Sequence, residues 1–247
     1  MTERKLVLVA AGNSELGLPI TEFLLADKKF EVFSTFRTDH KKSSDLKSLF
    51  EGKATSHCLK TDLRDSNQVA SLFSRVSTYG HIWGVLNFAG EATANRLVRT
   101  TQLEIENSIL NNLMPAINLT TEFFRYAKKE TIPGGRLVHI SSVTVRRPVP
   151  GTIPYVIAKS GIEGLVKASA EEAGRHKIAI NALRLGYFDR GMATRAVPSE
   201  MLNEISKNTA TLSLGTPENL FASLSYLLSE ESGFHTGSII DLDGGLV

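Results

Sequence analysis

The stretch LVLVAAGNSELG, from Leu6 to Gly17, decides the fold more than any other part of the chain. Its first half, Leu6–Ala11, is a short apolar run of the kind that forms a buried strand. The residues that follow, Gly12–Gly17, are typical of a turn that leads directly into a helix, where backbone amides can receive a pyrophosphate group. Because one such junction is a weak signal, its meaning depends on what surrounds it.

Further apolar runs rich in β-branched residues follow at regular intervals, and segments with helical periodicity separate most of them. This alternation predicts a doubly wound, parallel, seven-stranded sheet in an α/β, Rossmann-like fold, with ligands at the carboxyl ends of the strands. The runs are Glu31–Phe36, Ala54–Leu59, Ile82–Phe88, Arg136–Ser141, Ile178–Leu185 and Ser238–Leu242.

Composition is that of an ordinary globular protein, with 42% hydrophobic and 22% charged residues in 247. A net charge of +2 argues against nucleic acid or a membrane as partner, and no apolar run is long enough for a signal or a membrane span. The single cysteine, Cys58, fits a reducing cytoplasm. The histidines lack metal-ligand spacing, so we expect no metal, and His139 to be a buried, hydrogen-bonded ring.

No linker interrupts the chain, so residues 1–247 are expected to form one domain. The segment at about 190–215 breaks the alternation of strands and helices. We expect it to be a lid over the ligand, although an ordinary pair of connecting helices would leave the same pattern.

Tyr155 and Lys159 stand four residues apart, thirteen residues after Ser142. Residues i and i+4 share one face of a helix, so the Lys159 ammonium can lie beside the phenol. A free phenol has a pKa of about 10, and a neighbouring cation would lower the pKa of Tyr155. The three side chains together could protonate a ketone oxygen.

With these elements in order, the chain resembles the short-chain dehydrogenase/reductase family in its seven-stranded form, over essentially its whole length. Within that family it looks most like the 3-oxoacyl-[acyl-carrier-protein] reductases, through the stretch Gly215–Glu218 and the ending. The matching elements are the turn at 11–17, Asp62, Asn87–Gly90, Asn112, Ser142, Tyr155 with Lys159, Asn181–Ala182, Gly186, and the ending Thr236–Gly245.

The resemblance implies that Tyr155 transfers the proton, Ser142 hydrogen-bonds the substrate oxygen, and Lys159 acts on the phenol and holds the nicotinamide ribose. It also implies that Asn112, beside the alternative Asn111, anchors a water relay, and that Asp62 holds the adenine. The expected cofactor-binding residues are Gly12, Asn13, Ser14, Leu16, Arg37, Asp62, Leu63, Asn87, Ala89, Gly90, Tyr155, Lys159 and Gly186.

Arg37 follows the second strand, where an NAD enzyme would carry an acidic residue for the adenosine 2′-hydroxyl. A guanidinium can instead pair with a 2′-phosphate, which favours NADP, with NADPH preferred over NADH. The alternative is a solvated arginine in a turn.

The chain departs from the family's pattern at two places. Ala11 and Glu15 stand where glycines are usual, and a carboxylate about 5 Å from a pyrophosphate would cost about 3 kcal/mol unless Glu15 meets solvent or a cation. Arg190 holds a position at which the family commonly has threonine, and Thr194 is a candidate substitute.

We therefore expect NADPH-dependent reduction of a 3-oxoacyl thioester on acyl carrier protein or coenzyme A. A sugar, steroid or secondary-metabolite ketone is the alternative substrate, and a non-catalytic dinucleotide-binding sensor or scaffold is the alternative of another class. The pair Arg146–Arg147 suits an anionic substrate, or it is a solvated loop. The resemblance also implies a homotetramer, and surface lysines and arginines suit an acidic carrier protein as partner.

Overall fold

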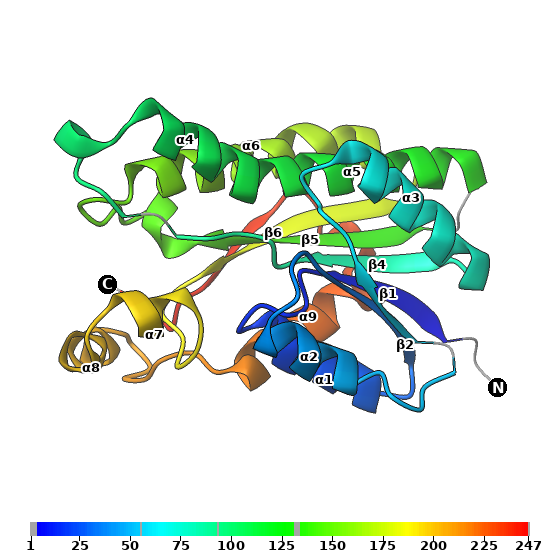
Figure 1. The fold of residues 1–247 in the computed structure, drawn as a ribbon, viewed down its shortest axis with the longest axis horizontal. Helices are drawn as coiled ribbons and strands as arrows, with labels where there is room; N and C mark the ends of the chain where they lie inside the picture. The colour runs from blue at the N-terminus through cyan, green and yellow to red at the C-terminus, as the bar shows by residue number, and fades with distance from the viewer. Residues whose placement is uncertain (1–3, 55, 93, 131–133, 247) are drawn as a thin grey trace.

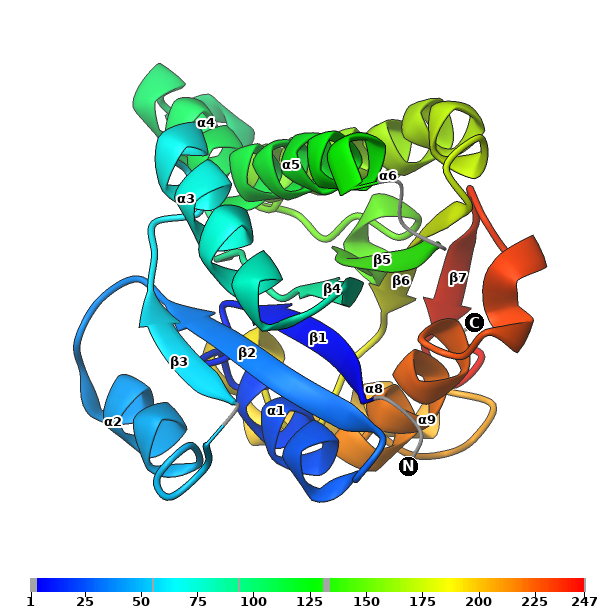
Figure 2. The same cartoon turned by 90° about the vertical axis from the view of Figure 1, so that its right-hand side faces the viewer.

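A computed structural model of the chain describes residues 4–54, 56–92, 94–130 and 134–246. Its centre is a sheet of seven parallel strands in the order β3-β2-β1-β4-β5-β6-β7 (Figures 1 and 2), so the predicted fold class is confirmed. The strands are β1 (Lys5–Ala10), β2 (Phe30–Phe36), β3 (His57–Lys60), β4 (Ile82–Asn87), β5 (Gly135–Ser142), β6 (Ile178–Leu185) and β7 (Ile239–Leu242).

Helices cover both faces of the sheet (Figures 1 and 2), with α3, α4, α5 and α6 on one face and α1, α2 and α9 on the other. Shorter 3-10 turns lie between some of them, among them η2 (Leu97–Arg99) and η4 (Val143–Val145). The helices are α1 (Gly17–Ala26), α2 (Lys41–Ser48), α3 (Ser66–Val76), α4 (Gln102–Ser108), α5 (Met114–Glu130), α6 (Ile153–Gly174), α7 (Met192–Ala196), α8 (Ser199–Lys207) and α9 (Pro217–Leu227).

The sheet is buried on both faces, and each face has its own apolar core. In β1, Leu6 and Leu8 pack into the core under α3 and α5, whereas Val7 and Val9 pack into the core under α1 and α9. Successive side chains of a strand point to opposite faces, so a central strand of such a sheet must be apolar at every position. This explains the uninterrupted apolar runs in the sequence.

The β3 strand differs from its predicted range, 54–59. It begins at His57, and residue 55 lies outside the described residues. β3 is at the edge of the sheet and pairs only with β2, from His57 opposite Phe33 to Lys60 opposite Phe36. Register with its single neighbour therefore sets its length, which apolar content alone does not reveal.

The direction of winding reverses between β1 and β4, which are neighbours in the sheet although two strands separate them in sequence. Loops that leave the carboxyl ends of these two strands diverge to opposite faces and open a crevice. The turn after β1 and the loop after β4 both reach this crevice. None of the described helices is long and apolar enough to cross a bilayer.

Candidate active site

The turn after β1 is held against β2 by its backbone. Gly12 donates its N–H to Thr35 O, and a Cβ on Gly12 would lie 1.9 Å from the Ser34 hydroxyl oxygen. Gly12, which we expected to contact the cofactor, is therefore needed for packing. Ala11 takes the left-handed conformation, with φ 57°, which costs a non-glycine residue about 1–2 kcal/mol.

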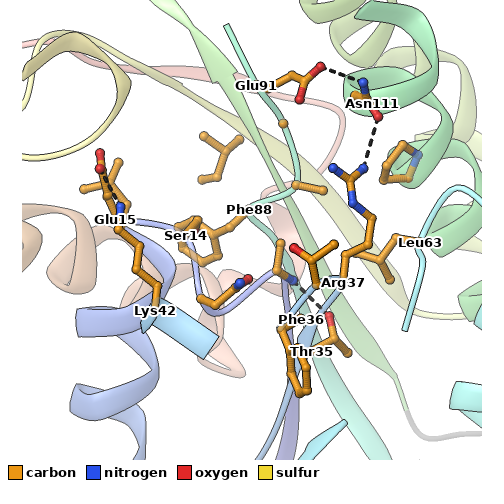
Figure 3. Close-up of a pocket in the computed structure, with 18 of the residues that line it drawn as sticks. Ser14, Glu15, Thr35, Phe36, Arg37, Lys42, Leu63, Phe88, Glu91 and Asn111 are labelled. Atoms are coloured by element: carbon orange, nitrogen blue, oxygen red, sulfur yellow. Dashed lines mark hydrogen bonds and ion pairs between the residues drawn. The ribbon is translucent and has the colours of Figure 1, made fainter. Parts of the chain in front are cut away.

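This turn forms one wall of a pocket of about 380 Å³ at the carboxyl ends of β1, β2 and β4 (Figure 3). Of the described residues that we expected to bind cofactor, four lie outside the lining: Gly12, Asn87, Tyr155 and Gly186. Those that line it are Asn13, Ser14, Leu16, Arg37, Asp62, Leu63, Ala89, Gly90 and Lys159.

One end of the pocket carries two arginines and two carboxylates and is organised around Asn111. The Asn111 side-chain oxygen accepts from Arg37 and from Arg64, each at 3.1 Å, and its nitrogen donates to Glu91 at 2.6 Å (Figure 3 shows the bonds with Arg37 and Glu91). The Arg64 guanidinium also grips Asp62, with a shortest distance of 2.6 Å, and holds the pKa of that carboxyl below its usual value. Sequence reasoning missed Arg64, although it stands only two residues after Asp62.

Glu15 meets two cations at the other end of the pocket. Its carboxylate lies 2.6 Å from Lys42 Nζ on α2 and 3.1 Å from Arg195 Nε on α7 (Figure 3 shows the first pair). The second oxygen of Glu15 is buried and has no hydrogen-bond partner among the described residues. Neither cation was singled out from the sequence, and together they supply the neutralisation that a carboxylate in a phosphate-binding turn requires.

Tyr155 and Lys159 lie one turn apart on the face of α6 that meets β5. Their side chains are 7% and 2% exposed, and Lys159 Nζ is 5.6 Å from the centre of the phenol ring and donates to Ile140 O at 2.9 Å. Burial raises the pKa of Tyr155 to about 12 and lowers the pKa of Lys159 to about 8. The expected lowering of the Tyr155 pKa by Lys159 is wrong for this structure, because desolvation of the phenolate outweighs other effects.

Ser142 ends β5 and points its hydroxyl toward the phenol. A hydrogen bond with Ser142 opposes the effect of burial on the pKa of Tyr155. The Ser142 oxygen also accepts from Thr144 N at 3.3 Å and from the Thr144 hydroxyl at 2.9 Å. The structure therefore brings together the serine, tyrosine and lysine that the spacing singled out.

Asn112 is fully buried in a short π-helical turn (Ile109–Leu113), a distortion often found at functional sites. Its side-chain oxygen accepts from Glu91 N at 3.1 Å, and its nitrogen donates to Ser108 O at 2.9 Å. Gly90 has φ 155°, and a Cβ there would lie 2.7 Å from Asn112 Oδ1 and 3.2 Å from Lys159 Nζ. Only glycine fits between these groups, whereas the water relay at Asn112 stays a prediction.

Behind the pocket, Asn87 belongs to a buried polar network. Its side chain bonds to His139 Nδ1 at 3.0 Å and accepts from Ala89 N, while His139 Nε2 meets the Thr120 hydroxyl at 3.0 Å. Burial lowers the pKa of His139 to about 3, so the ring is neutral. This confirms His139 as a buried, hydrogen-bonded ring that fixes the end of β4.

Gly186 serves packing, because a Cβ there would lie 2.6 Å from Asp243 Cα. Arg190 is exposed and does not line the pocket, and the Thr194 hydroxyl donates to Gly191 O. Arg146 is ion-paired with Asp241, whereas Arg147 forms no ion pair within the described chain. Neither Arg190 nor Arg146 is therefore placed as a free anion-binding group.

Known proteins share this fold. A solved short-chain dehydrogenase/reductase from Serratia marcescens superposes with a TM-score of 0.86 at 22% identity, over 98% of this chain and 97% of that one. The profile of a family described as enoyl-(acyl carrier protein) reductase matches residues 11–247. The chain belongs to the short-chain dehydrogenase/reductase family.

Relatives of known name fall in the same family. A 3-oxoacyl-[acyl-carrier-protein] reductase from Chlamydia muridarum is 28% identical over 98% of this chain and 97% of its own length. An acetoacetyl-CoA reductase from Cupriavidus necator is 30% identical over 75% of this chain and 74% of its own length. The solved structure of ElxO with NADP bound has a TM-score of 0.87 at 24% identity, covering 99% of both chains.

This short-chain dehydrogenase/reductase is thus an NAD(P)-dependent oxidoreductase, and its pocket fits a nicotinamide dinucleotide. The space that Gly90 leaves open beside Lys159 suits a ribose, and the Arg37 guanidinium suits an anionic group. When bound, the nicotinamide supplies or accepts a hydride. The chain's part is to hold this cofactor beside its own side chains.

We expect Lys159→Met to be more stable than the parent at pH 7. The pKa of Lys159 is about 8 in the folded protein, against an ordinary value of 10.5. Between these two pH values the unfolded chain binds more protons than the folded protein does. The parent therefore gains stability as the pH rises from about 8 to 10.5. The variant's advantage, on the order of 1 kcal/mol after loss of the Ile140 hydrogen bond, should be greatest below pH 8 and should be lost before pH 10.5, where the missing hydrogen bond is the remaining difference. Thermal unfolding tests it, with exposed Lys167→Met as control; a lower Tm for Lys159→Met at pH 7 would contradict it.

We expect Glu15→Gln to bind NADPH and NADH about tenfold more tightly, a gain of about 1.4 kcal/mol. The change removes a negative charge from the turn and frees Lys42 and Arg195 for the phosphates of the cofactor. Calorimetric titration measures it, and Glu22→Gln, an exposed change on α1, is the matched control. Unchanged or weaker binding by Glu15→Gln would show that Glu15 does not compete with the phosphates.

Proposed function

We propose that the enzyme uses NADPH to reduce a 3-oxoacyl thioester, carried on acyl carrier protein or coenzyme A, to the 3-hydroxyacyl product. The observation that carries the proposal is the buried phenol of Tyr155, whose pKa is raised to about 12 and which lies beside Ser142 and the Lys159 ammonium. The names of the Chlamydia and Cupriavidus relatives support the thioester substrate.

Reduction of a ketone places negative charge on its oxygen, and two hydroxyl donors aimed at that oxygen stabilise the charge. With its pKa raised to about 12, Tyr155 stays protonated at neutral pH and so carries the proton that ketone reduction consumes. Lys159, with a pKa of about 8, is mostly charged at pH 7 and would stabilise the phenolate that remains.

A preference for NADPH is supported by Arg37. Its guanidinium bonds to Asn111 and forms no ion pair with a carboxylate among the described residues, and β2 ends in Phe36 rather than in a carboxylate. Arg64 lies nearby but is already paired with Asp62, and Glu91 is bonded to Asn111. A guanidinium placed like that of Arg37 suits a 2′-phosphate.

Other parts of the sequence-based hypothesis stay predictions: the homotetramer, the carrier-protein partner, the cytoplasmic location and closure of the 190–215 segment as a lid. A sugar, steroid or secondary-metabolite ketone is the alternative substrate, and dinucleotide binding without turnover would make the protein a sensor. The family profile's description names enoyl reduction, so a crotonyl thioester belongs in the test.

The central test is NADPH oxidation with acetoacetyl-CoA, compared between the parent and Tyr155→Phe. We expect the parent to be active and the variant to lose at least about a hundredfold in kcat, because the proton donor is gone while the ring still fills its site. Full activity of Tyr155→Phe would refute the proton-donor role. Turnover of crotonyl-CoA but of no ketone would refute ketone reduction, and NADPH binding without any turnover would favour the sensor.

The cofactor preference is tested at Arg37. We expect Arg37→Ala to weaken NADPH binding about tenfold and to leave NADH binding within twofold, because only NADPH carries the 2′-phosphate. Arg75→Ala, an exposed change on α3, is the control. Equal losses for both cofactors, or tighter binding of NADH than of NADPH by the parent, would contradict the preference.

A further inference from the structure

A buried carboxylate lies on the same face of α6 as the catalytic residues. Glu163 follows Lys159 by one helical turn, and its side chain is 8% exposed. It accepts from the Ser141 hydroxyl at 2.7 Å, from Arg184 Nε at 3.0 Å and from a terminal Arg184 nitrogen at 2.7 Å. Because a buried charge is costly unless paired and hydrogen-bonded, this set of donors fixes Glu163 in place.

The partners of Glu163 belong to a row that crosses three strands. Ser141 on β5 is the register neighbour of Arg184 on β6, which is in turn the register neighbour of Asp241 on β7. Arg184 completes the row by donating to Asp241 at 2.7 Å. The row therefore connects α6 with β7 across the sheet, at the level of the catalytic serine.

Arg146 extends this row of charged side chains back toward the active site. It stands directly after η4, the short turn that begins at Ser142, and its guanidinium meets Asp241 at 2.7 Å and Asp243 at 3.2 Å. This series of ion pairs thus begins at Glu163 on the catalytic helix and ends at the loop that follows the catalytic serine. It touches neither the pocket nor the phenol.

We propose that Arg146 is a positioning residue that holds Ser142 against Tyr155 by tying η4 to β7. This inference rests on the proposed ketone reduction. Ser142 is the last residue of β5, where it pairs with Leu185 on β6, and its hydroxyl is bonded to Thr144 in η4, so a shift of η4 would change where the hydroxyl points. With the tether on Asp241, the distance between the serine and the phenol is set from both sides, since α6 is tied to the same strand through Glu163 and Arg184.

The expected effect falls on rate rather than on stability. The side chain of Arg146 is 43% exposed, and exposed ion pairs contribute little to stability. Catalysis is far more sensitive, because a displacement of about 1 Å at a reacting group can lower the rate about a hundredfold. Arg147 provides a matched control, since it has the same charge in the same loop without an ion pair in the described structure.

The experiment compares Arg146→Met, Arg146→Lys and Arg147→Met with the parent, using acetoacetyl-CoA and NADPH. We expect Arg146→Met to lose at least about tenfold in kcat with KM for NADPH within twofold, and Arg147→Met to keep kcat within twofold. Arg146→Lys should fall between them, because one ammonium cannot match a guanidinium that spans two carboxylates. Hydrogen exchange of the segment 143–147 should be faster in Arg146→Met alone.

Several results would overturn the proposal. An unchanged kcat in Arg146→Met, or equal losses in Arg146→Met and Arg147→Met, would exclude a positioning role. A rise in KM for acetoacetyl-CoA without a fall in kcat would make Arg146 a substrate-binding group instead. If the parent reduces no ketone, the proposed function fails separately, and unchanged hydrogen exchange in Arg146→Met would still refute the tether.

Discussion

The burial of one ammonium group organises this active site. Lys159 is enclosed by α6, β5 and the loop after β4, and among the described residues its hydrogen-bond acceptor is the carbonyl of Ile140. A charge without a paired carboxylate is unfavourable in a protein interior, and the shifted pKa measures that cost. Glycine is required at position 90 because no side chain fits beside this nitrogen. The neighbouring phenol of Tyr155 is buried too and remains protonated.

Two kinds of polar element surround that charge. Neutral groups, among them His139 and Asn87, satisfy one another inside the sheet and set the position of the β4 end. Charged groups lie farther out and link separate segments, as Glu15 links the first turn to α7 and Glu163 links α6 to β6. The neutral network is buried and fully bonded, and the charged link at Glu163 is buried as well, whereas Arg195, which pairs with Glu15, is exposed to water.

Much of this could be predicted from the sequence. Apolar runs with helical segments between them led to the correct sheet, and the spacing of Ser142, Tyr155 and Lys159 led to side chains that do meet in space. What could not be predicted depends on long-range contacts. The partners of Glu15, the roles of Arg64 and Asn111, and the direction of the Tyr155 pKa shift follow from burial and from segments far apart in the chain. The sequence suggested that Gly12 and Gly186 contact the cofactor. A glycine at a turn leaves room either for a ligand or for a neighbouring segment of the protein, and the sequence alone does not distinguish the two cases.

The ion pair between Glu15 and Arg195 joins residues 180 positions apart. Parallel sheets fold slowly because such distant segments must meet before they stabilise each other, and this pocket wall cannot exist until the first strand and the segment after β6 have both docked. A dinucleotide would therefore recognise only the fully folded chain. Because it would bind only the folded state, the dinucleotide would stabilise that state by mass action. The population of partly folded states would fall as its concentration rises.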